Sequence, residues 1–134
     1  MSSTIATVFL SLFCFVPPAS QSAPAVGVSS ASLAQTRFQE LEEAASLIES
    51  EKLKEAETIL LRILSSDNSD ARALNLLGVI RGQQGRDEES ERLFHEALIA
   101  NPALTAAHIN LGRLFSERKE DDRAFEEYQA AVLA

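Results

Sequence analysis

The chain has 134 residues, enough for one small domain, and its 20 acidic residues outnumber its 12 basic ones. No charged residue or histidine precedes Arg37, and because nucleic-acid binding needs a clustered cationic surface, this balance argues against a nucleic-acid partner. From Arg37 onward the sequence is rich in Ala, Leu, Glu and Arg, with Pro102 as its single proline, which is a helical composition.

Residues 1–25 have the layout of a secretory signal peptide. An apolar run over residues 5–16 is 12 residues long, whereas a helix that crosses a bilayer needs about 20. Two prolines end the run, and small or polar residues follow. This order predicts cleavage after Ser22 or Ala25 and export to the periplasm or the extracellular space. The alternatives are an uncleaved membrane tether formed by residues 5–16 and a start codon assigned too far upstream.

The only cysteine, Cys14, lies inside the apolar run, and Phe13 before it is too large for a lipoprotein signal. Cleavage would leave a mature chain without disulfide or thiolate chemistry. Residues 26–36 are small and polar. They predict a short disordered linker, with helix beginning near Ser32.

The stretch from Ala71 to Leu104 predicts two amphipathic helices joined by a turn. Apolar and small residues recur at helical spacing in each half, with breaks at Gly85 and Pro102. We expect Gly85 to close the first helix in a left-handed conformation and Asp87 to cap the second helix. Where the two predicted helices cross, the small residues Gly78 and Ala97 allow the backbones to approach closely. The larger residues Leu77 and Phe94 fill the space on either side.

The pattern of this stretch recurs every 34 residues. Residues 105–134 repeat it but end before the period closes; the matching residues are Leu111, Gly112, Tyr128 and Ala131. Residues 37–70 match well in their second half, but Glu43 stands where leucine is expected, so we interpret them as a degenerate first repeat. Six helices of about 12 to 15 residues are therefore predicted.

These stretches resemble tetratricopeptide repeats (TPRs), which are helix–turn–helix units of 34 residues. They depart from the family's pattern at Arg81, Ser90, His108 and Lys119. The resemblance implies an all-α fold, an α-solenoid of antiparallel helix pairs with about three TPR units over residues 37–134, preceded by the signal segment and the linker. The packing positions that it implies are Leu77, Gly78, Phe94, Ala97, Pro102, Leu111, Gly112, Tyr128 and Ala131.

No residue pattern indicates catalysis, a cofactor or a metal. His95 and His108 lie on different predicted helices, and no further ligands stand at a metal-binding spacing. The carboxylate run 87–89 falls at a predicted helix start, where negative charge is favourable by about 0.3–1 kcal/mol. The sequence therefore predicts a chain that is not an enzyme and that binds neither cofactor nor metal.

The family resemblance implies a concave groove lined by the first helices of successive repeats. The groove candidates that it gives are Arg72, Asn75, Val79, Gln83, Ile109 and Arg113. Members that hold the carboxylate tail of a chaperone peptide use basic residues and asparagine at the fifth and ninth places of the repeat. Arg113 resembles that set, but Val79 and Ile109 do not, so we expect no such clamp. The resemblance implies a non-catalytic scaffold that binds a peptide or protein.

Two rival hypotheses follow from the last predicted helix, where Phe125, Val132 and Leu133 have no following helix to cover them. The first takes the chain as the N-terminal TPR part of a longer enzyme or envelope assembly factor, truncated at Ala134. The second takes the uncovered helix as a site of self-association. Membrane contact is expected only through an uncleaved N-terminal segment.

Overall fold

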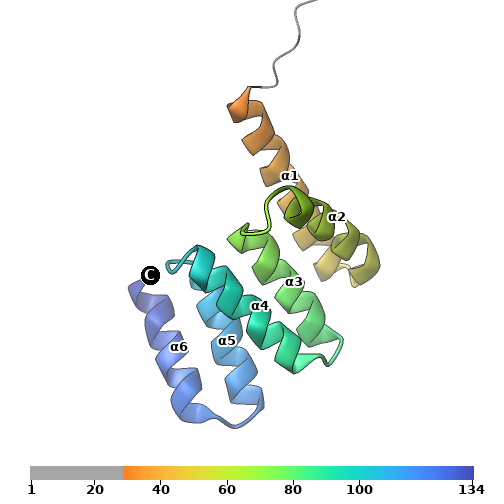
Figure 1. The fold of residues 1–134 in the computed structure, drawn as a ribbon. Helices are drawn as coiled ribbons and strands as arrows, with labels where there is room; N and C mark the ends of the chain where they lie inside the picture. The colour runs from red at the N-terminus through yellow and green to blue at the C-terminus, as the bar shows by residue number, and fades with distance from the viewer. Residues whose placement is uncertain (1–28) are drawn as a thin grey trace, which may run out of the picture.

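The computed structural model describes residues 29–134, which form an all-α fold (Figure 1). The helices are α1 (Ser30–Glu49), α2 (Leu53–Ser66), α3 (Ala71–Gln83), α4 (Asp87–Ala100), α5 (Thr105–Glu117) and α6 (Asp121–Leu133). The predicted signal peptide, residues 1–25, and the alternative tether, residues 5–16, lie outside the described residues. Within residues 29–134, no helix is both long enough and apolar enough to cross a membrane.

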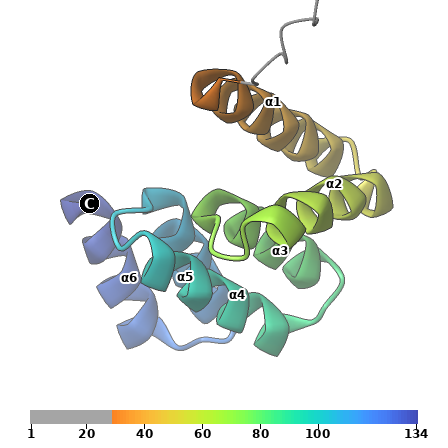
Figure 2. The ribbon, with the colours of Figure 1, turned by 45° about the horizontal axis from the view of Figure 1, so that its top comes forward.

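Successive helices pack as the pairs α1–α2, α3–α4 and α5–α6, and α2–α3 and α4–α5 contacts join the pairs into a stack. The stack begins with α1 at one end and finishes with α6 at the other (Figure 1 and Figure 2). This arrangement confirms the predicted all-α array of antiparallel helix pairs, with three pairs in residues 29–134.

Helix α1 is longer than the sequence analysis predicted. It begins at Ser30, with Ser29 as its N-cap, and has 20 residues. Residues 30–36 are therefore helical, which corrects the predicted linker at these residues, while residues 26–28 lie outside the described residues. The observed start lies two residues before the predicted start near Ser32. Alanine, leucine and glutamine in this stretch are good helix formers, and no glycine or proline interrupts them. The buried residues of α1 begin only at Leu41, so its first turns project from the stack (Figure 1).

The turn inside each helix pair contains one residue with a left-handed backbone. These residues are Glu51, Gly85 and Lys119, with φ of 60°, 72° and 61°. They lie 34 residues apart, so the backbone repeats in step even where the residue type changes. The prediction for Gly85 is confirmed, whereas Glu51 and Lys119 adopt the same conformation against the steric preference of a side chain with a Cβ.

Substitutions at two of these left-handed positions, Lys119 and Gly85, should change the free energy of unfolding in opposite directions. We expect Lys119→Gly to raise the free energy of unfolding by about 0.5–1 kcal/mol, because glycine relieves the left-handed strain but adds entropy to the unfolded chain. Gly85→Ala should lower it by about 1 kcal/mol through strain alone, because a Cβ at Gly85 would have no heavy atom within 4 Å. Urea denaturation followed by circular dichroism measures both; a Lys119→Gly variant less stable than the wild type would contradict the account.

The prediction that Asp87 caps helix α4 is wrong. Its N-cap is Arg86, which makes no side-chain capping hydrogen bond, and Asp87 is the first helical residue. Asp87, Glu88 and Glu89 instead fill the first turn, where the positive end of the helix dipole stabilises negative charge. Side-chain capping does occur at α3, where Asp70 accepts a hydrogen bond from the backbone N–H of Ala73 at 3.0 Å.

Gly78 and Gly112 let aromatic rings lie against the backbone of the partner helix. A Cβ at Gly78 would lie 2.6 Å from Cε1 of Phe94, and one at Gly112 would lie 2.6 Å from Cε1 of Tyr128. Phe94 is buried, whereas Tyr128 is 40% exposed, because within residues 29–134 no helix packs on the outer side of α6. The other predicted packing residues, apart from Pro102, are buried or half-buried: Leu77, Ala97, Leu111 and Ala131.

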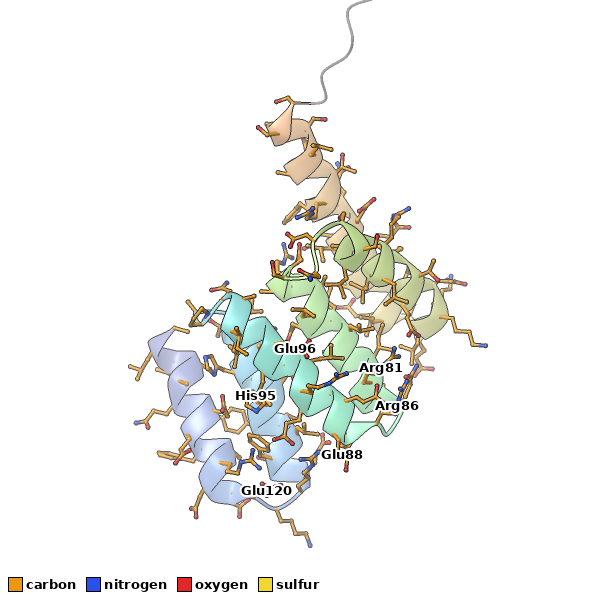
Figure 3. The ribbon with its side chains drawn as sticks, in the orientation of Figure 1. Arg81, Arg86, Glu88, His95, Glu96 and Glu120 are labelled. Carbon is orange, nitrogen blue, oxygen red and sulfur yellow. The ribbon has the colours of Figure 1, made fainter. Side chains whose placement is uncertain are left out.

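The departures Arg81 and Ser90 have structural roles. The Ser90 hydroxyl donates a buried hydrogen bond of 2.8 Å to the backbone carbonyl of Gly78, joining α4 to α3. Arg81 lies near the α3–α4 turn, as does Arg86 (Figure 3), and its guanidinium binds the Glu57 carboxylate of α2. This hydrogen bond holds the pKa of Glu57 below its ordinary value, against the opposing effect of burial. Both departures thus replace apolar packing with polar links between helices.

His108 occupies a position that the repeat pattern uses for packing. A polar residue is accommodated there because its two ring nitrogens contact two other segments. Its Nδ1 lies 2.7 Å from Oε2 of Glu127 on α6, and its Nε2 lies 3.1 Å from the carbonyl oxygen of Pro102. Pro102 itself is exposed, so it shapes the α4–α5 turn through its backbone and does not pack in the core as the resemblance implied. His108 therefore ties α5 to α6 and to the preceding turn.

Candidate interaction groove

The first helices of the pairs, α1, α3 and α5, are joined by polar contacts between side chains. Arg72 donates a 2.7 Å hydrogen bond to Glu42 of α1, and its guanidinium lies 5.2 Å from the centre of the Phe38 ring. Asn75 accepts a 2.9 Å hydrogen bond from Asn110 of α5 and is only 6% exposed. Arg72 and Asn75, two of the predicted groove residues, therefore hold neighbouring helices together.

A polar hollow of about 210 Å³ lies between α3, the start of α4 and α5. It brings together three of the predicted groove residues, Val79, Gln83 and Arg113, but not Ile109, which is 47% exposed outside the hollow. The complete lining consists of Val79, Gly82, Gln83, Asp87, Ser90, Phe94, Asn110, Arg113, Leu114 and Glu117. Asp87 and Asn110 were missed as groove residues, although Asn110 directly follows a predicted groove place.

The lining of the hollow includes one cation, Arg113, and two carboxylates, Asp87 and Glu117. The Arg113 side chain is 59% exposed, and its Nε lies 3.9 Å from Oε1 of Glu117, one helical turn further along α5. A surface pair at that distance contributes about 0–1 kcal/mol, so Arg113 can exchange it for another anion at little cost. Asp87 supplies a second carboxylate, and Gln83 supplies an amide that can donate and accept. The hollow can therefore hydrogen-bond a polar chain.

A second, more apolar hollow of about 440 Å³ lies beside the projecting turns of α1. Leu33 and Phe38 line it and are more than half exposed. Its two arginines are both paired: Arg72 with Glu42, and Arg37 with Asp67 at 2.9 Å. This hollow offers apolar contact area and less polar recognition than the hollow beside Arg113.

No cluster of metal ligands accompanies either hollow. In the described part of the chain, no group of three or more His, Cys, Asp or Glu side chains is placed to hold a metal ion. A carboxylate-centred network joins Glu91 to Arg118 and Arg123. Burial raises the pKa of Glu91, but hydrogen bonds from the two arginines outweigh it and lower the pKa overall. This network links α4 to α6 and the turn before it.

The fold of these six helices is that of a TPR domain. Thirty-five chains of solved structures match it. One is the second TPR of Spaghetti (RPAP3) bound to the HSP90 peptide SRMEEVD, with a TM-score of 0.63 over 74% of this chain and 92% of that chain, at 15% sequence identity. No protein-family model and no curated protein sequence match this chain. At this identity, the likeness establishes a shared fold and says nothing by itself of a shared ligand.

Proposed function

We propose that this chain is a non-catalytic protein–protein interaction module that binds an extended segment of a partner along α3 and α5. The observation that carries the proposal is the polar hollow at Arg113, where a weakly paired guanidinium lies beside amide and carboxylate groups. Extended peptides present backbone N–H and C=O groups as well as side chains, and this mixture of donors and acceptors suits them. The TPR domain of RPAP3, which shares the fold, is bound to a peptide.

The ligand that fits the hollow differs in character from a C-terminal tail held by its carboxylate. At the fifth and ninth places of the three repeats, Arg113 is the single basic residue, and Asn75 is already bound to Asn110. One exposed arginine recognises one anionic group, whereas Asp87 and Glu117 favour donors or a cation beside it. We therefore propose an internal segment that carries an acidic residue next to a basic or amide residue.

Charge reversal at Arg113 tests the proposed groove. We expect Arg113→Glu to reduce capture of the partner about tenfold, because an attractive charge becomes repulsive. The full chain serves as bait in extract from the producing cell, with captured proteins quantified by mass spectrometry. The control is Arg92→Glu on α4, since Arg92 is also exposed and does not line the hollow. Equal capture by both variants, with unchanged helicity, would refute the groove.

We also propose that residues 1–25 direct export of the chain. Support comes from the apolar run over residues 5–16, the prolines that follow it and the small residues up to Ala25. A phosphatase reporter that is active only outside the cytoplasm should be active when fused after Ser30. Leu12→Arg should bring it to background, because arginine in an apolar segment costs about 2.5–3.5 kcal/mol on insertion. Ser3→Arg, before the run, is the control and should retain activity; an active Leu12→Arg fusion would refute a signal role.

A further inference from the structure

Exposed apolar side chains gather on the outer face of α6. Phe125, Val132 and Leu133 are 66%, 85% and 81% exposed, and Tyr128 adds a half-covered ring. On α4, the counterparts of Tyr128 and Val132 one period earlier are covered: Phe94 packs with Leu111 and Phe115 of α5, and Leu98 packs against the same cluster. The counterpart of Leu133 is Ile99, which is 82% exposed. At Tyr128 and Val132, the α6 face therefore matches places that the following pair covers on α4.

The covered faces indicate what shape fits α6. Helices α3 and α5 share three buried places, which lie four and then three residues apart. In both helices the first place holds alanine, the second leucine, and the third isoleucine or leucine. In α3 these are Ala73, Leu77 and Ile80, and in α5 they are Ala107, Leu111 and Leu114. An occupant of α6 should therefore be an amphipathic helix with apolar side chains at this spacing.

The charge around the α6 face indicates which charge the side chains of the docked helix should carry. Helix α6 carries four carboxylates and one arginine. Asp121, Asp122 and Glu126 form no ion pair or side-chain hydrogen bond with any residue in 29–134, and helical geometry places Asp122 and Glu126 along one edge of the apolar stripe. Between the pairs of the stack, Glu57 of α2 receives Arg81 and Glu91 of α4 receives Arg118. Phe125 occupies their place on α6, so Asp122 and Glu126 are the carboxylates left for a basic group there. A basic occupant complements this edge.

We propose that Phe125, Tyr128, Val132 and Leu133 dock an amphipathic helix of another protein, with basic residues along the edge that meets Asp122 and Glu126. This surface lies on α6, the last described helix of the stack (Figure 2), and no residue of α6 lines the groove at Arg113.

A second copy of this chain fits the surface poorly. Pairing two α6 helices brings like charges together. The end of the stack formed by α1 does not match either, because the three places that are apolar in α3 and α5 are polar and exposed in α1. These residues are Gln39, Glu43 and Ser46. Continuing the stack with another copy's α1 would bury Glu43 against the apolar stripe at a large desolvation cost.

The test uses two synthetic peptides of about 18 residues with the same helical apolar pattern, one with lysines along its edges and one with glutamates. Fluorescence anisotropy with the full chain should give at least about tenfold tighter binding of the lysine peptide. Phe125→Asp with Val132→Asp should abolish this binding, while Ile99→Asp, which changes an exposed residue of α4, should not affect it. Asp122→Lys with Glu126→Lys should reverse the preference between the peptides.

Three results would overturn the proposal. The first is equal binding of both peptides, and the second is lysine-peptide binding that survives the Phe125→Asp and Val132→Asp changes. The third is a dimer of the full chain, seen by light scattering, that these changes dissolve, since the occupant would then be a second copy. Arg113→Glu should leave peptide binding to α6 unchanged, so failure of the proposed groove and failure of this docking surface are distinguishable.

Discussion

Replacing Phe94 by alanine should lower the free energy of unfolding by about 3–5 kcal/mol. Phe94 is 2% exposed and forms a cluster with Leu111 and Phe115 of α5 and Ala124 of α6. Its ring also lies against the backbone at Gly78. Removing the ring opens a cavity in the contact between the α3–α4 pair and the α5–α6 pair, where neither backbone can collapse without losing other contacts.

The matched control is Tyr128→Ala, one period later. Tyr128 faces Gly112 as Phe94 faces Gly78, but its ring is 40% exposed, so its removal should cost about 1 kcal/mol. Urea denaturation by circular dichroism measures both variants. In Phe94→Ala we also expect α5–α6 to unfold before the rest, because neighbouring units of a repeat array depend on their interface. Equal losses in the two variants would contradict this account.

The 34-residue period made the helical stack predictable, because the residues that form each crossing recur in sequence. Leu77 and Gly78 return as Leu111 and Gly112, and the structure buries all four. The extension of α1 was not predictable from this pattern, since its first turns bury no side chain and so carry no apolar periodicity. Local helix propensity, and not packing, defines that segment.

The candidate groove was predictable only in part, because a repeat pattern gives the direction of a side chain but not its partner. Val79, Gln83 and Arg113 do line the hollow. Arg72 is bound to Glu42, 30 residues earlier, and Asn75 to Asn110, 35 residues later. Each of these pairs joins residues of two successive repeats. The pattern within one repeat therefore does not predict that the pair forms.

Gly78→Ala should lower the free energy of unfolding by about 1–3 kcal/mol, although alanine is the better helix former by about 1 kcal/mol. The added Cβ would lie 2.6 Å from Cε1 and 2.8 Å from Cδ1 of Phe94, whose ring is held by α5. Gly112→Ala meets the Tyr128 ring at the same distance, but that ring is half-exposed on the last helix and can turn outward. Gly112→Ala should therefore be close to neutral.

The first repeat accommodates an alanine at the place of Gly78. The cause of the destabilisation expected for Gly78→Ala can therefore be tested directly. Ala44 and Leu60 occupy the places of Gly78 and Phe94, and both are fully buried. Gly78→Ala combined with Phe94→Leu recreates that pair, because a leucine side chain leaves room for the Cβ. The double variant should be more stable than the sum of the single changes predicts, by about 1 kcal/mol or more in a double-mutant cycle. Additive effects would mean that Gly78 is required for a reason other than the Phe94 ring.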